Sequence, residues 1–217
     1  MTALPIDPEV ERKLLAVPDV SRETIEALQR LAELLAKWNR SINLVARRDE
    51  ELLWPRHILD SAALWPVMAP TSRQAGAVLD IGSGGGFPGL VLAAIARLAG
   101  AELRFDLVDS DQRKCAFLRE AAARLDLPAS ATCARVESLE VKQWDWVTAR
   151  ALASVSDLLD MTEPMRDGGA RLALLKGDRV KDELTDAQRR WHIEHQVLPN
   201  ALTGRGYILI IERAQRI

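Results

Sequence analysis

The chain has 217 residues, of which 48% are hydrophobic, and a mean hydropathy of −0.07, which is typical of a folded globular protein and argues against disorder. No apolar run reaches the length of about 20 residues that spans a bilayer, and the first residues lack the basic and apolar segments of a signal peptide, so we expect a cytoplasmic protein. A net charge of −2 and an isoelectric point near 6.0 exclude strong nonspecific attraction to nucleic acid.

The first third of the chain predicts a short helical unit. Residues 21–38 are expected to form an amphipathic helix, because apolar residues recur on one face at Ile25, Leu28, Leu31, Leu35 and Trp38. A polar stretch over residues 71–76 follows two prolines and is typical of a connection. We therefore expect a helical extension over residues 1–70 and a second domain over residues 71–217.

Strands and helices alternate through the second domain. The expected strands cover residues 77–81, 103–108, 130–134, 145–149, 170–175, 195–198 and 207–212. Helices are expected over residues 90–98, from about 111 to 125, and over 180–190. This alternation predicts an α/β fold with a doubly wound sheet.

A glycine-rich loop joins the first of these strands to its helix. Its glycines are Gly82, Gly84, Gly85, Gly86 and Gly89. Because glycine has no Cβ, a ligand can approach the backbone here, at the edge of the sheet where α/β proteins bind ligands. The G-x-G-x-x-G spacing from residue 84 matches the dinucleotide fingerprint, and a tight turn that binds nothing is the structural alternative. Asp80 precedes the glycines and suits a cationic ligand better than a pyrophosphate. The resulting pattern resembles motif I of the class I methyltransferases, whose cofactor S-adenosyl-L-methionine carries an ammonium and a sulfonium group.

The next strand ends in an acidic residue, Asp109. A carboxylate there, some twenty residues beyond the loop, can accept hydrogen bonds from ribose hydroxyls, and this holds for NAD and S-adenosyl-L-methionine alike. The alternative is that Asp109 caps the helix that begins near Asp111.

The chain offers little for metal or disulfide chemistry. Cys115 and Cys133 are the only cysteines, and they form no CxxC pair. The three histidines, at positions 57, 192 and 195, are not clustered with other ligands at metal-binding spacing. We expect no metal and no disulfide.

Six short segments carry further polar or glycine-rich motifs, at residues 38–44, 56–61, 80–89, 134–137, 149–151 and 175–177. From about residue 20 to near the C-terminus, they resemble the ordered motif set of the RsmG family, also called GidB. The WNxxxN motif that begins at Trp38 and the RHxxDS motif that begins at Arg56 are more specific than the glycine loop, because generic class I enzymes lack them.

The resemblance implies both a fold and an activity. The fold is the Rossmann-like class I S-adenosyl-L-methionine-dependent methyltransferase fold, a mostly parallel seven-stranded sheet with helices on both faces, here with a short N-terminal helical extension. The activity is methylation of N7 of the guanine at position 527, in the 530 loop of bacterial 16S rRNA. Because N7 has a free lone pair and no proton to remove, we expect no catalytic acid, base or nucleophile, and positioning should supply the rate.

Together, the loop and the resemblance imply the following cofactor-binding residues: Gly82, Gly84, Phe87, Asp109, Val136, Glu137 and Arg150. The alternatives are a core position for Phe87 and for Val136, and a surface ion pair for Arg150. A C5-pyrimidine methyltransferase is disfavoured because no cysteine follows the fourth strand, and an exocyclic-amine methyltransferase because residues 148–153 lack the Pro-Pro-aromatic segment.

RNA contact is expected from a basic and aromatic cluster around the two polar motifs. The substrate-contacting residues expected are Asn39, Arg56, His57 and Lys176. Arg40 and Arg48 add charge nearby, and Trp38 and Trp54 could stack on an unpaired base or belong to the core. Asn39 could instead cap the end of its helix.

Two other functions stay open at this point. One is an NAD-linked oxidoreductase, which the glycine spacing permits but for which the chain shows no hydride-transfer site. The other is a noncatalytic ribosome-assembly module on the same fold. The partner expected is 16S rRNA or the small ribosomal subunit. We expect a monomer, although the sequence shows nothing about oligomeric state beyond the absence of a heptad repeat.

Overall fold

A computed structural model describes residues 6–46, 49–68 and 75–217, and shows one seven-stranded sheet in the order β3-β2-β1-β4-β5-β7-β6. The first five strands run parallel, and β7 pairs antiparallel with both β5 and β6. The mostly parallel, doubly wound sheet expected from the sequence is confirmed. Since the chain leaves β1 on one side to form β2 and β3 and then returns to β4, the topological switch point lies between β1 and β4.

The strands agree with the sequence prediction to within one or two residues at most ends. They are β1 (Gly76–Ile81), β2 (Leu103–Asp109), β3 (Ala129–Cys133), β4 (Trp146–Arg150), β5 (Arg171–Lys176), β6 (Trp191–Pro199) and β7 (Tyr207–Arg216). The prediction was wrong mainly for β6 and β7, which are longer because they form a long antiparallel hairpin with each other. The buried runs of β1 and β4 follow from their cover on both faces.

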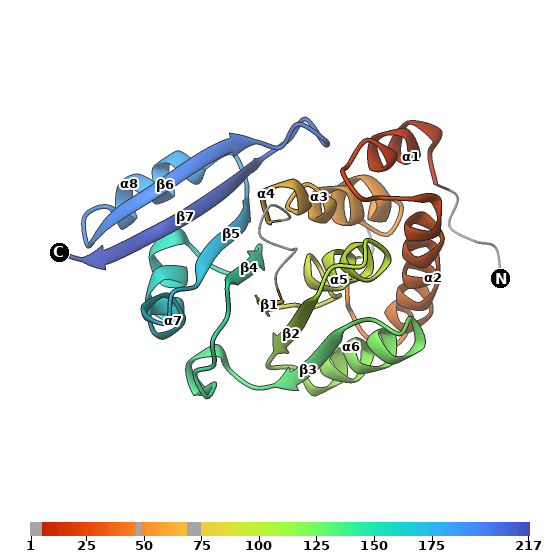
Figure 1. Ribbon diagram of the computed structural model, residues 1–217, viewed down its shortest axis with the longest axis horizontal. Helices are drawn as coiled ribbons and strands as arrows, with labels where there is room; N and C mark the ends of the chain where they lie inside the picture. The colour runs from red at the N-terminus through yellow and green to blue at the C-terminus, as the bar shows by residue number, and fades with distance from the viewer. Residues whose placement is uncertain (1–5, 47–48, 69–74) are drawn as a thin grey trace.

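Helices cover both faces of the sheet (Figure 1). One face carries α5 (Gly89–Leu98) and α6 (Gln112–Arg124), whose apolar residues share a core with β1 and β2. The other face carries α7 (Val155–Asp167) and α8 (Val180–Ala187), whose apolar residues form a second core with β4 and β5. The sequence did not predict α7, because Pro164 lies inside it and interrupts the helical pattern.

The N-terminal unit packs on the α5 and α6 face. It contains α1 (Pro8–Leu15), α2 (Arg22–Asn39), a π-helix η2 (Leu53–Ile58), α3 (Leu59–Ala62) and α4 (Trp65–Met68). Ser21 caps α2 in a reciprocal arrangement with Thr24. Its apolar residues belong to the same core as α5 and α6, so the extension is fixed against the sheet domain. The expected boundary between residues 70 and 71 lies outside the described residues.

Within the described residues, no helix is both long and apolar enough to span a bilayer.

Candidate functional site

The glycine loop is held to the carboxyl end of β2 by Ser83. The Ser83 amide donates to the Val108 carbonyl oxygen, and the Ser83 hydroxyl accepts from the Val108 amide and donates to the carbonyl oxygen of Asp80. Ser83 is 2% exposed, so this polar bridge is part of the fold. The loop therefore lies at the edge beside the switch point, where open α/β sheets bind ligands.

Asp80 does not face this site. Its carboxylate is fully buried and accepts from the Thr148 hydroxyl at 2.8 Å and from the Gly89 amide at 3.3 Å. Burial raises the pKa of Asp80 to about 6. The expectation that Asp80 attracts a cationic ligand was wrong, because the side chain points beneath the loop and ties β1 to β4 and to the start of α5.

Gly84 is the open position of the loop. Its φ of +55° is one that side chains with a Cβ rarely adopt, and a Cβ added there would meet only the Gly82 carbonyl oxygen, at 3.7 Å. The Gly84 amide donates to the Asp109 carboxylate at 2.9 Å. The backbone at Gly84 thus faces open space beside an acid, as a nucleoside-binding loop requires.

Asp109 ends β2 and stabilises the turns on both sides of the site. One carboxylate oxygen accepts from the Gly84 amide, and the other accepts from the Asp111 amide at 2.9 Å. Each oxygen keeps a second lone pair, so the carboxylate can still accept from ribose hydroxyls. The helix-capping alternative was wrong for Asp109, since the N-cap of α6 is Asp111, which accepts from the Arg113 and Lys114 amides.

Asp109→Ala should therefore weaken S-adenosyl-L-methionine binding by about 1–3 kcal/mol, because the ribose and the Gly84 amide lose an acceptor. Isothermal titration calorimetry gives the dissociation constant, and thermal unfolding gives the stability. Asp111→Ala is the matched control: it should cost roughly 1 kcal/mol of stability through the lost cap and leave the affinity unchanged. Equal affinities in the two variants would contradict the assignment.

The other expected cofactor residues lie around the same edge. Val136 is 9% exposed and starts a short 3-10 helix after β3, and Glu137 beside it is exposed. Phe87 is buried, and its ring packs against that of His57 at 5.1 Å. The structure thus favours the core alternative for Phe87. Gly82 is covered by the side chain of Leu152, which a Cβ at Gly82 would meet at 2.6 Å.

Arg150, His57 and Asp60 form a partly buried cluster at the end of β4. The Arg150 guanidinium lies 2.5 Å from His57 Nδ1 and 3.6 Å from the Asp60 carboxylate. Because a guanidinium only donates, His57 Nδ1 accepts and the neutral ring carries its proton on Nε2, which has no hydrogen-bond partner among the described residues. Burial, and next the Arg150 charge, lower the pKa of His57 to about 4. Arg150 is 17% exposed, so the alternative of a surface ion pair was wrong.

Asp60 connects this cluster to the β6–β7 hairpin. Its carboxylate accepts from the Asn200 amide at 2.6 Å and, at 3.4 Å, from the Thr203 hydroxyl. Burial raises the pKa of Asp60, and the nearby Arg150 charge opposes that rise. Sequence reasoning missed Asp60, Asn200 and Thr203. Asp60 belongs to the RHxxDS motif and could have been found there, whereas the hairpin loop carried no signal.

A wide groove of about 1620 Å³ adjoins the cluster. Its walls come from α1, from the η2–α3 segment, from the ends of β4 and β5, and from the β6–β7 hairpin loop. The charged residues that line it include Arg56, Asp60, Arg150, Lys176 and Arg205. Leu152 connects the groove to the glycine loop, because it lines the groove and also packs over Gly82.

The four residues expected to contact RNA lie in different environments. Arg56 is about half exposed and pairs with Asp49 at 2.8 Å, whereas His57 is buried. Asn39 uses both amide protons and both lone pairs of its oxygen on Val45, Glu50 and Leu44, so it holds the segment after α2 in place instead of capping the helix, and no group is left for a base. Lys176 binds Glu183 and the Ala153 carbonyl and is 9% exposed.

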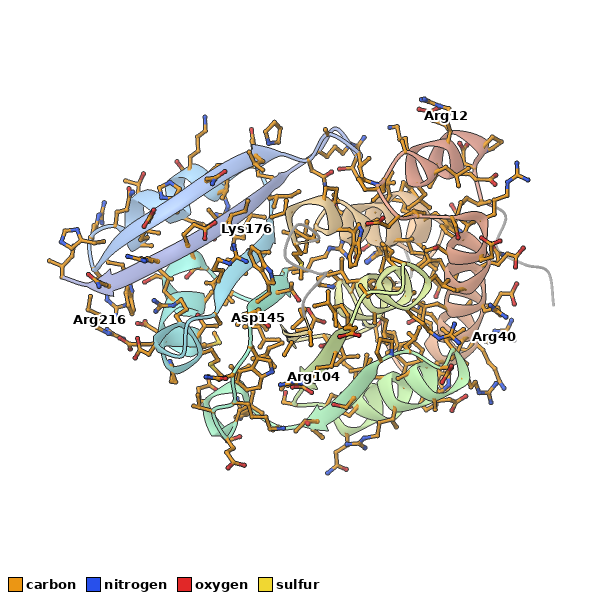
Figure 2. The ribbon with its side chains drawn as sticks, viewed as in Figure 1. Arg12, Arg40, Arg104, Asp145, Lys176 and Arg216 are labelled. Atoms are coloured by element: carbon orange, nitrogen blue, oxygen red, sulfur yellow. The ribbon has the colours of Figure 1, made fainter. Side chains whose placement is uncertain are left out.

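Two arginines and two tryptophans were also expected near the RNA surface. Figure 2 shows Arg40 at the end of α2, well separated from Lys176. Trp54 is 4% exposed and belongs to the core, and the half-buried Trp38 packs edge-on against the core residue Phe117, so the structure favours the core alternative for both. Arg48 lies outside the described residues.

Among the described residues, histidine, cysteine and acidic side chains are the candidates for metal ligands. Within the part of the chain that the structure describes, no group of three or more His, Cys, Asp or Glu side chains is arranged to hold a metal ion. Cys115 and Cys133 are free thiols.

Solved structures share this fold at low sequence identity. An S-adenosylmethionine-dependent methyltransferase from Aquifex aeolicus matches with a TM-score of 0.54 and 14% identity, over 83% of this chain and 97% of that one. A branched-chain polyamine synthase from Thermus thermophilus matches equally well, with a TM-score of 0.54 and 18% identity, over 84% of this chain and 63% of that one. The fold alone therefore does not determine the reaction.

Sequence relatives are more specific. The family model described as GidB, rRNA small subunit methyltransferase G, matches residues 24–206. Two relatives are named ribosomal RNA small subunit methyltransferase G. The protein from Gluconobacter oxydans is 40% identical over 91% of this chain and 98% of its own length. The protein from Dinoroseobacter shibae is 41% identical over 82% of this chain and 90% of its own length. The resemblance inferred from the motifs is confirmed: the chain belongs to the rRNA small subunit methyltransferase G family.

Proposed function

We propose that this protein transfers a methyl group from S-adenosyl-L-methionine to N7 of the guanine at position 527 of 16S rRNA. The observation that carries the proposal is the pairing of the open Gly84 with Asp109 beside the switch point, where Leu152 connects the glycine loop to a groove of about 1620 Å³. Gly84, Asp109 and Val136 would hold the cofactor, which supplies an electrophilic methyl group. The oxidoreductase and assembly-module alternatives are not favoured, since the family is one of methyltransferases.

The residues near the groove suit a reaction that moves no proton. Guanine N7 attacks through its own lone pair, and the positive charge passes from sulfur to the purine, so the protein has only to align the two groups. His57 is held neutral beside Arg150 and contributes no additional positive charge. We therefore assign no general acid, base or nucleophile.

The same proposal assigns roles to the two parts of the chain. Residues 1–70 form the helical extension, in which Arg56 contacts RNA and the buried His57 supports Arg150 rather than touching RNA itself, while residues 71–217 form the methyltransferase domain. We propose that the partner is the 16S rRNA or the small ribosomal subunit, and that the protein is cytoplasmic and acts as a monomer without a metal ion.

Mapping the modified nucleotide tests this proposal. Small subunits from a strain that lacks the protein should carry an unmodified guanine 527, and the purified protein with labelled S-adenosyl-L-methionine should methylate it at N7. Primer extension after borohydride and aniline cleavage locates the N7-methylated base. Label at another nucleotide or at another atom would overturn the target, and no transfer at all would overturn the activity.

The RNA surface is tested by replacing Arg40, Arg48 and Arg56 together with Ala. If these side chains bind phosphates, RNA binding should weaken, and the slope of log affinity against log salt should flatten by about 0.7 for each phosphate that is no longer neutralised. Cofactor affinity should not change. If the affinity and the slope stay at their wild-type values, these arginines do not form the RNA surface. The next candidates are the basic residues at and near α8, Arg179, Lys181, Arg189 and Arg190.

A further inference from the structure

The segment that follows β4 has an unusual backbone conformation. Ala151 has a φ of +49°, and the other two non-glycine residues with positive φ among the described residues are aspartates, which tolerate this region better than alanine. Such a conformation persists only where the surroundings impose it, and it is concentrated at functional sites.

Two polar anchors impose it. At one end, Arg150 is held by Asp60 and His57. At the other end, the Lys176 ammonium donates to the Ala153 carbonyl at 2.9 Å, and the Glu183 carboxylate, paired with Lys176, accepts from the Val155 amide at 3.1 Å. Lys176 and Glu183 thus fix the start of α7 and the path of the chain from Arg150.

The conformation holds Leu152 at the boundary between the glycine loop and the groove. Leu152 is 39% exposed, although it is a large apolar residue. One of its methyl groups lies 2.6 Å from where a Cβ on Gly82 would be, so it rests directly on the loop, and it also lines the groove. Because the two ion pairs anchor the backbone on both sides of Leu152, its exposed side chain is held at a defined place, where the face of an aromatic base could cover it.

We propose that Leu152 is a positioning residue for methyl transfer: its side chain packs against the ring face of the target guanine and sets the angle at which N7 meets the methyl group. This inference rests on the proposed function. It assigns Lys176 a role through Leu152 rather than through direct contact with RNA, in agreement with its burial. It also explains why residue 82 is a glycine without any contact to the cofactor, because a Cβ there would collide with Leu152.

Leu152→Ala tests the proposal. Single-turnover methyl transfer to unmethylated small subunits at saturating cofactor and subunit should slow by about 10- to 100-fold, because the base is bound but poorly aligned. The dissociation constant of S-adenosyl-L-methionine, from calorimetry, should stay within twofold. Leu152→Met, which restores an apolar side chain of similar volume, should recover most of the rate. Leu15→Ala, at a leucine of 40% exposure on α1, is the matched control and should behave like wild type.

Three results would overturn it. A wild-type rate in Leu152→Ala would show that the side chain does not position the base. A cofactor affinity that weakens as much as the rate falls would make Leu152 a cofactor contact instead. If the wild-type protein itself fails to methylate the subunits, the proposed function fails and this inference fails with it. The wild-type control distinguishes this outcome from the first, in which wild type and variant are equally active.

Discussion

Gly84→Val should reduce S-adenosyl-L-methionine binding at least 100-fold while the protein remains folded. The backbone at Gly84 has a φ of +55°, which a β-branched residue strongly resists, and its Cβ would project into the open space beside Asp109. Either the loop shifts, which breaks the Gly84 hydrogen bond to Asp109, or the side chain fills the space that the ligand needs. Calorimetry with the purified variant measures the loss of affinity.

Gly100→Val is the control for the loss of stability that a valine at positive φ causes anywhere in the chain. Gly100 also has a positive φ, +68°, and a Cβ there meets nothing within 4 Å, but it lies in the turn between α5 and β2. The two variants should lose similar amounts of thermal stability, and only Gly84→Val should lose the cofactor. Gly84→Ala, with a smaller side chain, should lie between them in affinity. An unchanged affinity in folded Gly84→Val would show that the ligand does not approach the loop here.

The fold could be predicted from local signals because each signal was strong by itself. The apolar run of β1, the glycine loop and the helical spacing of α6 each identify an element, and their alternation then leaves few topologies. Where the local signal was mixed, prediction failed: α7 contains Pro164, and half of β6 alternates with polar residues. The residues around Arg56 and His57 also showed no helical periodicity, so the π-helix there was not predicted.

The candidate site was harder because side-chain direction depends on tertiary contacts. Asp80 was expected to face a ligand, yet Thr148, 68 positions later, binds its carboxylate under the loop. Asp60 and Asn200 are 140 positions apart and meet only because the β6–β7 hairpin reaches the N-terminal unit. The sequence motifs therefore brought several polar residues to one edge of the sheet, but they did not separate side chains that are open at that edge from those that hold the loop.

His57 should make the stability of the protein fall in acid. The folded protein lowers the pKa of His57 from 6.5 to about 4, first through burial and then through Arg150, so in the range between these values the unfolded chain binds a proton that the folded protein does not. The stability contribution is fully present above pH 6.5 and is lost as the pH falls toward 4. A shift of this size corresponds to about 3 kcal/mol.

Comparison with His57→Gln isolates this contribution, because glutamine cannot titrate and its carbonyl oxygen can still accept from Arg150. The free energy of unfolding, measured in urea between about pH 7.5 and pH 4, should fall by about 3 kcal/mol more in wild type than in the variant. The titrations of Asp80 and Asp60 occur in both proteins and cancel in the difference. His192→Gln, at an exposed histidine of β6, should follow the wild-type curve. Parallel curves for wild type and His57→Gln would show that the folded protein does not keep His57 neutral, and Arg150 would then have no acceptor at Nδ1.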